Sequence, residues 1–180
     1  MPPRERLHHH YLKPHSTYRS AAVHAGHFKL DLGSRLIVFT TAIHAFGIAL
    51  LALLGARIRA YLKRQSLDFW TAIILLTTVL GTMGLSLAVL HGVEAALWAG
   101  AYLSLGALDT PAEAMLFSVD SMTTRGASGL TLHQHWQVMG ALEAVAGMLM
   151  FGISTAYMFF VMQTDAAALI RRRLGLSPHG

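Results

Sequence analysis

The chain has 180 residues, enough for one soluble domain, but 54% of them are hydrophobic, 13% are charged and the mean hydropathy is +0.48, which indicates a membrane protein. The absence of cysteine excludes disulfides and thiolate metal or redox sites. The formal net charge of +5 comes from basic residues beside apolar runs, without an aromatic-basic motif, so it indicates membrane topology and no nucleic-acid partner.

Residues 1–34 are polar and hold six of the eleven histidines, together with scattered basic residues. Because they contain no long apolar run, we expect a retained tail that is disordered or interfacial. The histidines match the composition of metal-binding tracts, but their spacing defines no ligand set. A solvated tail is therefore the favoured interpretation.

The transmembrane part is expected over 35–163, and its first span over about 36–56, close to the length that crosses a bilayer. The span ends at a basic cluster, which is typical of a cytoplasmic loop. His44 is its only ionisable side chain. A neutral histidine bonded to a neighbouring helix is favoured over a functional group at this position.

The second span is expected over 69–105, where the apolar character is nearly unbroken. A helix of this length extends about 55 Å, more than one crossing of a hydrocarbon core of about 30 Å requires. We favour one kinked helix over two spans, because His91-Gly92 offers a weak point but no polar turn. His91 and Glu94 then share one face at i, i+3 spacing.

A short helix is expected over 111–122, with Thr110 as its N-cap and Pro111 at its first position. At about 18 Å it is too short to cross the bilayer, so it is expected to be re-entrant. Its final carbonyl groups then need partners, and a monovalent cation held by the following loop, 123–129, would supply one. The alternative is a re-entrant hairpin that only packs the bundle.

The segment FSVDSMTTRGASG resembles the pore segment of the tetrameric potassium-channel superfamily, in which a Phe-Ser run precedes TTVGYGD. Its flanks, over about 40–163, are similar to a small bacterial ion-channel family. Arg125 stands where that pattern has valine, and Ala127, Ser128 and Gly129 replace its Tyr-Gly-Asp, so altered or weak cation selectivity is expected. The resemblance implies an ion filter of six residues: Thr123, Thr124, Arg125, Gly126, Ala127 and Ser128.

The orientation of Arg125 is left open by the sequence. In the family's geometry this side chain points back toward the pore helix, where Asp120, or Glu94 on the second span, would neutralise it as filter support. An unpaired guanidinium at membrane depth would cost several kcal/mol. An Arg125 that faced the pore axis would instead repel cations and admit anions.

The last span is expected over 136–162, followed by a basic tail over 164–180. Gly147 and Gly152 are candidate gating hinges, with close helix packing as an equal alternative. Glu143 lies within this span and needs a partner or a water-lined wall. Three crossings place seven basic residues of the first loop and the tail on one side, so the C-terminus is expected to be cytoplasmic and the pore loop external.

The expected fold class is therefore an all-α, multi-pass membrane protein with three transmembrane helices and a re-entrant pore helix and filter-like loop between the last two. One chain has one such loop and no internal repeat, so a closed ring requires several copies. The resemblance implies four, in the bacterial inner membrane. We expect a homotetrameric channel that conducts monovalent cations, potassium among them.

No enzymatic activity, cofactor or bound metal is expected beside the permeant ion, and the surrounding partner is the lipid bilayer. Two alternatives remain open. One is a non-conducting subunit or membrane scaffold with the same architecture. The other is a haem- or proton-carrying helical bundle that uses His44, His91 and Glu94.

Overall fold

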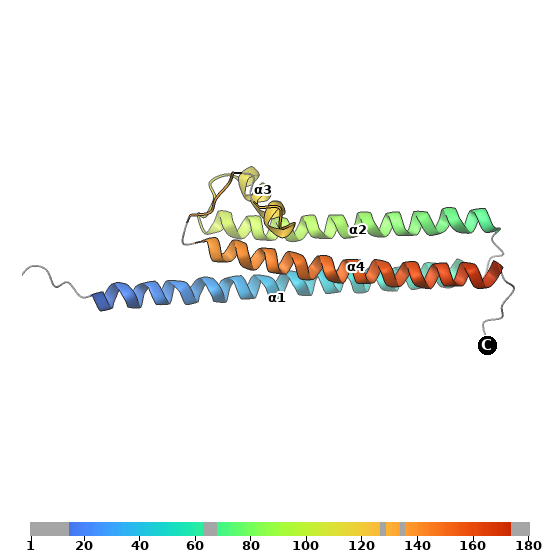
Figure 1. The fold of residues 1–180 in the computed structure, drawn as a ribbon, viewed down its shortest axis with the longest axis horizontal. Helices are drawn as coiled ribbons and strands as arrows, with labels where there is room; N and C mark the ends of the chain where they lie inside the picture. The colour runs from blue at the N-terminus through green and yellow to red at the C-terminus, as the bar shows by residue number, and fades with distance from the viewer. Residues whose placement is uncertain (1–14, 63–67, 127–128, 134–135, 174–180) are drawn as a thin grey trace, which may run out of the picture.

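The computed structural model describes residues 15–62, 68–126, 129–133 and 136–173. The three long helices lie side by side, and the short α3 lies against one end of α2 and α4 (Figure 1). Within the described ranges the regular structure is helical throughout, in four helices: α1 (His15–Leu62), α2 (Phe69–Ser104), α3 (Pro111–Met122) and α4 (Gln137–Arg173).

Three of these helices hold stretches that are long and apolar enough to cross a membrane. Each stretch overlaps one of the three spans expected from the sequence, which confirms an all-helical protein with three candidate transmembrane helices. This architecture is consistent with a multi-pass membrane protein. The stretches are Leu30–Tyr61, Phe69–Ser104 and Gln137–Ala168.

Two of the long helices extend beyond the expected span boundaries. α1 begins at His15, so much of the segment expected as a tail is helical, and an ion pair of 3.0 Å between Asp31 and Arg35 supports it at i, i+4 spacing. α4 continues to Arg173, past the expected end at residue 162. The expected boundaries follow the ends of the apolar runs. Backbone hydrogen bonding, however, continues a helix into polar sequence wherever no helix-breaking residue stops it.

α2 is one continuous helix, in agreement with the favoured single span. Its N-cap is Asp68, whose side chain accepts hydrogen bonds from the backbone N–H groups of Trp70 and Thr71 at 3.1 and 3.2 Å. The hydrogen bond from the Thr71 hydroxyl, and then that from its N–H group, lower the pKa of Asp68. The helix passes through His91-Gly92 without ending, because glycine lowers helix propensity by only about 1 kcal/mol.

The tightest packing lies where α3 meets α2 and α4. Trp98 and Tyr102 of α2 and Met139 of α4 have no exposed surface, and Phe117 of α3 meets the Tyr102 ring edge to face at 5.3 Å. The C-terminal end of α3 rests on Gly147 of α4: a Cβ atom there would lie 2.3 Å from the Met122 carbonyl oxygen. This candidate hinge is therefore a close-contact position, whereas a Cβ at Gly152 would meet no atom within 4 Å.

Most of the remaining helix surface faces outward. In the most apolar windows of the three stretches, only 11%, 11% and 28% of the residues are buried within one chain. Exposed apolar surface of this extent requires lipid or other protein around it.

The contact at Gly147 predicts a stability difference between two glycines of the same helix. We expect Gly147→Ala to destabilise the fold by about 1–3 kcal/mol, because the added methyl group displaces the backbone of Met122. The matched change Gly152→Ala should be neutral or stabilising, since it raises helix propensity in open space. Unfolding of both variants in mixed detergent micelles measures the difference, and equal effects would contradict this packing.

Candidate functional site

The α3 helix ends in a compact backbone cap at the start of the candidate filter loop. The N–H group of Thr124 donates to the Ser121 carbonyl and that of Arg125 to the Asp120 carbonyl, both at 3.0 Å. This pair of bonds is the Schellman motif, which needs a left-handed residue after the C-cap. Thr124 takes that role with φ of 55°, although glycine usually occupies it.

The cap bears on the expectation that a cation satisfies the carbonyl groups at the end of α3. The Val119 carbonyl accepts the N–H group and the hydroxyl of Thr123, at 3.0 and 2.7 Å, and the next two carbonyls accept the bonds of the Schellman motif. Three of the last four carbonyl groups are therefore satisfied within the chain, and the fourth, of Met122, lies against Gly147. The three bonded carbonyl groups need no cation as a partner.

The candidate filter residues are exposed where the structure describes them. Thr123, Thr124, Arg125 and Gly126 are all exposed in the single chain, and Gly126 has φ of 80°. Ala127 and Ser128 lie outside the described residues.

Of the two acids considered for Arg125, Asp120 is the nearer partner. The Arg125 Nε atom lies 3.5 Å from Asp120 Oδ1, with the arginine side chain 70% exposed and the carboxylate 1% exposed. Glu94 instead contacts two histidines at 2.8 and 3.2 Å. The geometry therefore pairs Arg125 with Asp120, whereas Glu94 faces the histidines.

A second buried acid joins three helices beneath α3. Glu143 of α4 has no exposed surface; it accepts a hydrogen bond from the Tyr102 hydroxyl of α2 at 2.7 Å and contacts the Ser118 hydroxyl of α3. Ser118 also lies 2.8 Å from the carbonyl oxygen of Ala95. The partner that an intramembrane carboxylate requires is thus supplied by α2 and α3 together.

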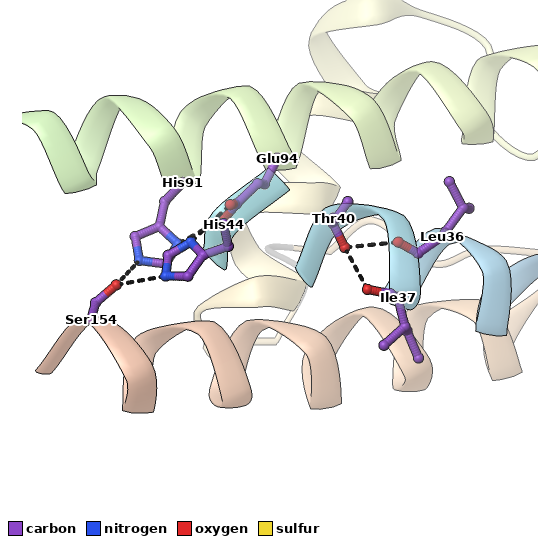
Figure 2. Close-up of polar contacts among 7 residues, drawn as sticks. All are labelled: Leu36, Ile37, Thr40, His44, His91, Glu94 and Ser154. Atoms are coloured by element: carbon purple, nitrogen blue, oxygen red, sulfur yellow. Dashed lines mark hydrogen bonds and ion pairs between the residues drawn. The ribbon is translucent and has the colours of Figure 1, made fainter. Parts of the chain in front are cut away.

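The third polar cluster lies deeper in the bundle and joins α1, α2 and α4 (Figure 2). His44 Nδ1 lies 2.8 Å from Glu94 Oε1, and His44 Nε2 lies 2.9 Å from Ser154 Oγ. His91 Nε2 lies 3.3 Å from the same Ser154 oxygen, and His91 Nδ1 lies 3.2 Å from Glu94 Oε2. We call these four residues the His-Glu-Ser ring.

The His-Glu-Ser ring is enclosed by protein. His44 and Glu94 have no exposed surface, and the His91 side chain is 14% exposed. The imidazole of His91 stacks on the Phe151 ring with centroids 4.3 Å apart and an angle of 14°. The favoured interpretation of His44, a histidine bonded to neighbouring helices, agrees with these contacts.

A metal ion fits the ring poorly, although donor atoms of His44, His91 and Glu94 lie within 4.8 Å of one another. Both ring nitrogens of His44 already have hydrogen-bond partners in the protein. Within the ring, two atoms are buried without a hydrogen bond, His91 Nδ1 and Glu94 Oε2. A structural or catalytic zinc site takes at least three protein ligands.

Sequence reasoning did not single out the hydroxyl groups of the two buried networks, those of Ser154, Tyr102 and Ser118. Ser154 lies in an apolar run beside Thr155, whose hydroxyl bonds its own helix at the Phe151 carbonyl, as most such residues do. The available signal is position: Ser154 follows Glu143 by eleven residues, three helical turns, and so shares its face of α4. Tyr102 and Ser118 carry no comparable sequence signal.

The left-handed conformation of Thr124 predicts a stabilising substitution. We expect Thr124→Gly to stabilise the fold by about 1 kcal/mol, because glycine adopts positive φ without the steric cost of a β-branched side chain. Thr123→Gly is the control: its φ is −84° and it loses the hydroxyl bond to Val119, so it should destabilise. Thermal unfolding in detergent distinguishes the two, and a destabilising Thr124→Gly would contradict the cap.

The contact between Arg125 and Asp120 predicts a measurable coupling. A double-mutant cycle with Arg125→Val and Asp120→Asn should give a coupling free energy of about 0.5–1 kcal/mol, because the exposed guanidinium is screened by solvent. The same cycle with Glu94→Gln in place of Asp120→Asn should give none. Coupling of Arg125 to Glu94 alone would reverse the assignment of the acids.

Comparisons with protein-family models, with curated proteins and with solved structures found no match to this chain. The resemblance of residues 40–163 to potassium-channel pore regions therefore stays a prediction that rests on the residues quoted for it.

Proposed function

We propose that this chain forms a channel-like membrane pore from four copies, with α3 as a re-entrant pore helix and residues 123–129 beside the path of monovalent cations. The observation that supports this best is the position of α3: it is a helix of 12 residues whose end lies against a long apolar helix, ten residues from the start of that helix. The proposal also rests on the resemblance to tetrameric potassium channels. It places the chain in the bacterial inner membrane with a cytoplasmic C-terminus.

Contacts with α4 and α2 give the position of α3 along these two helices. Gly147, which touches the end of α3, lies ten residues after the start of α4, or about 15 Å along its axis. On α2, Ala95 contacts Ser118 of α3 nine residues before the helix ends, or about 14 Å. If the hydrocarbon core, about 30 Å thick, begins at these ends of α2 and α4, the end of α3 lies about halfway across it.

Assembly from several copies follows from the same geometry. One chain presents one loop on one side of α2 and α4, and a single loop cannot enclose a path. The outward apolar surface of the long helices is available for contacts between copies as well as for lipid.

A non-conducting member of the same architecture is the second candidate, and two observations favour it. Three of the last four carbonyl groups of α3 are bonded within the chain and need no ion. The exposed positive charge of Arg125 at this end opposes the partial negative charge of the helix dipole, which lowers the attraction for a cation. Ion flux separates this candidate from the conducting one.

The first test is the mass of the assembly. Native mass spectrometry of the detergent-solubilised protein should give about four times 19.6 kDa. A monomer under mild conditions would exclude both candidates, since each has the architecture of a multi-copy pore.

The second part of this test is flux into liposomes under potassium, sodium and chloride gradients. We expect Arg125→Val to raise cation flux several-fold, because it removes an exposed positive charge beside the proposed path. Arg35→Gln removes an equally exposed arginine of α1 and should leave flux unchanged. A tetramer that passes no ion with either residue at position 125 would favour the non-conducting candidate.

A further inference from the structure

The His-Glu-Ser ring is a closed circuit of four polar contacts (Figure 2). It runs from Glu94 to His44, on to Ser154, then to His91 and back to Glu94. Every contact joins two atoms that each have a lone pair, so every contact needs one proton between its atoms to be attractive.

The residues in their ordinary neutral-pH forms do not supply enough protons. Each neutral imidazole brings one N–H group, the Ser154 hydroxyl brings one proton and an ionised Glu94 brings none. Three protons are then available for four contacts. One contact is left with two lone pairs facing each other, whichever tautomers the two histidines adopt.

One contact of the ring differs from the other three. His91 Nδ1 and Glu94 Oε2 lie 3.2 Å apart, and both are buried without a hydrogen bond. The other three contacts have hydrogen-bond geometry at 2.8, 2.9 and 3.3 Å. Those three use all the protons of the neutral histidines and the serine.

We infer that the His-Glu-Ser ring is a proton-binding site, which holds one further proton between His91 and Glu94. With that proton each of the four contacts has one proton and the ring has no net charge. An ionised carboxylate without a counter-charge is costly where His44 and Glu94 have no exposed surface.

Other titratable groups on the same helices have partners of their own. Glu143 of α4 contacts Tyr102 and Ser118, and Arg59 of α1 lies 3.8 Å from Asp165 of α4. No titratable side chain outside the ring is among the contacts that the structure gives to it, within the part of the chain described. The extra proton is therefore assigned to the ring members.

The bound proton affects stability because the ring ties three helices together. When the chain unfolds, Glu94 and the histidines return to water and release this proton at neutral pH and above. The folded state then binds one proton more than the unfolded state, so stability falls as the pH rises through the range of release. For one proton the unfolding equilibrium constant rises by up to tenfold per pH unit.

Glu94→Gln isolates this proton. The amide N–H group can donate to His91 Nδ1 while the amide oxygen accepts from His44, so four protons serve four contacts without an ionisable carboxyl. We expect this variant to fold in detergent. Its free energy of unfolding should not show the decrease with rising pH that is expected of the wild type. Asp31→Asn removes an exposed carboxylate of α1 and should keep the wild-type pH profile. A Glu94→Gln profile that follows the wild type would overturn the inference.

A measurement on the wild-type protein keeps the inference testable if that variant does not fold. At neutral pH, the ¹⁵N NMR signals of the His44 and His91 rings and the ¹³C carboxyl signal of Glu94 should together account for one proton more than two neutral imidazoles and an ionised carboxylate bring. Two neutral imidazoles beside an ionised carboxylate would overturn the proton site. Elemental analysis that finds a transition metal in stoichiometric amount in the wild type would also overturn it, in favour of a metal site. None of these measurements depends on ion flux, so a failure of the proton site can be distinguished from a failure of the proposed pore.

Discussion

The structure depends on one constraint: a carboxylate buried between apolar helices must find its hydrogen-bond partners on other helices. Glu94 and Glu143 both have no exposed surface. Glu143 contacts Tyr102 of α2 and Ser118 of α3, while Glu94 contacts His44 of α1 directly and is linked to Ser154 of α4 through the two histidines. Apolar side chains alone distinguish poorly between protein neighbours and lipid, because both environments are equally apolar. The two acids therefore supply the specific contacts that fix which faces of α1, α2, α3 and α4 meet.

The sequence predicts the helices well because their signals are local. Apolar length identifies the three long helices, and a Thr-Pro start with a short apolar run gives the bounds of α3 as the structure has them. The beginning of α1 at His15 and the end of α4 at Arg173 are not predicted. Hydropathy marks where a helix can enter a membrane, and it contains no information on how far the helix extends into polar sequence.

The candidate sites are predicted less well because they depend on which helix faces meet. The sequence indicates Asp120 or Glu94 as the partner of Arg125, but only the packing of α3 places Asp120 nearby and turns Glu94 toward α1. The cap of α3 was also not foreseen, because a threonine with positive φ is unusual and leaves no signature in the sequence. Local patterns thus identify the polar residues, and long-range packing decides their roles.

The two buried networks meet at consecutive residues of α2, which joins the ring to the base of α3. The side chain of Glu94 belongs to the His-Glu-Ser ring, while the carbonyl oxygen of Ala95 contacts Ser118, which in turn contacts Glu143. Rotation of α2 at this turn would break contacts in both networks at once. The position of α3 and its exposed loop is therefore fixed by the same turn of α2 that holds α1 and α4 in register, whether the assembled copies conduct ions or not.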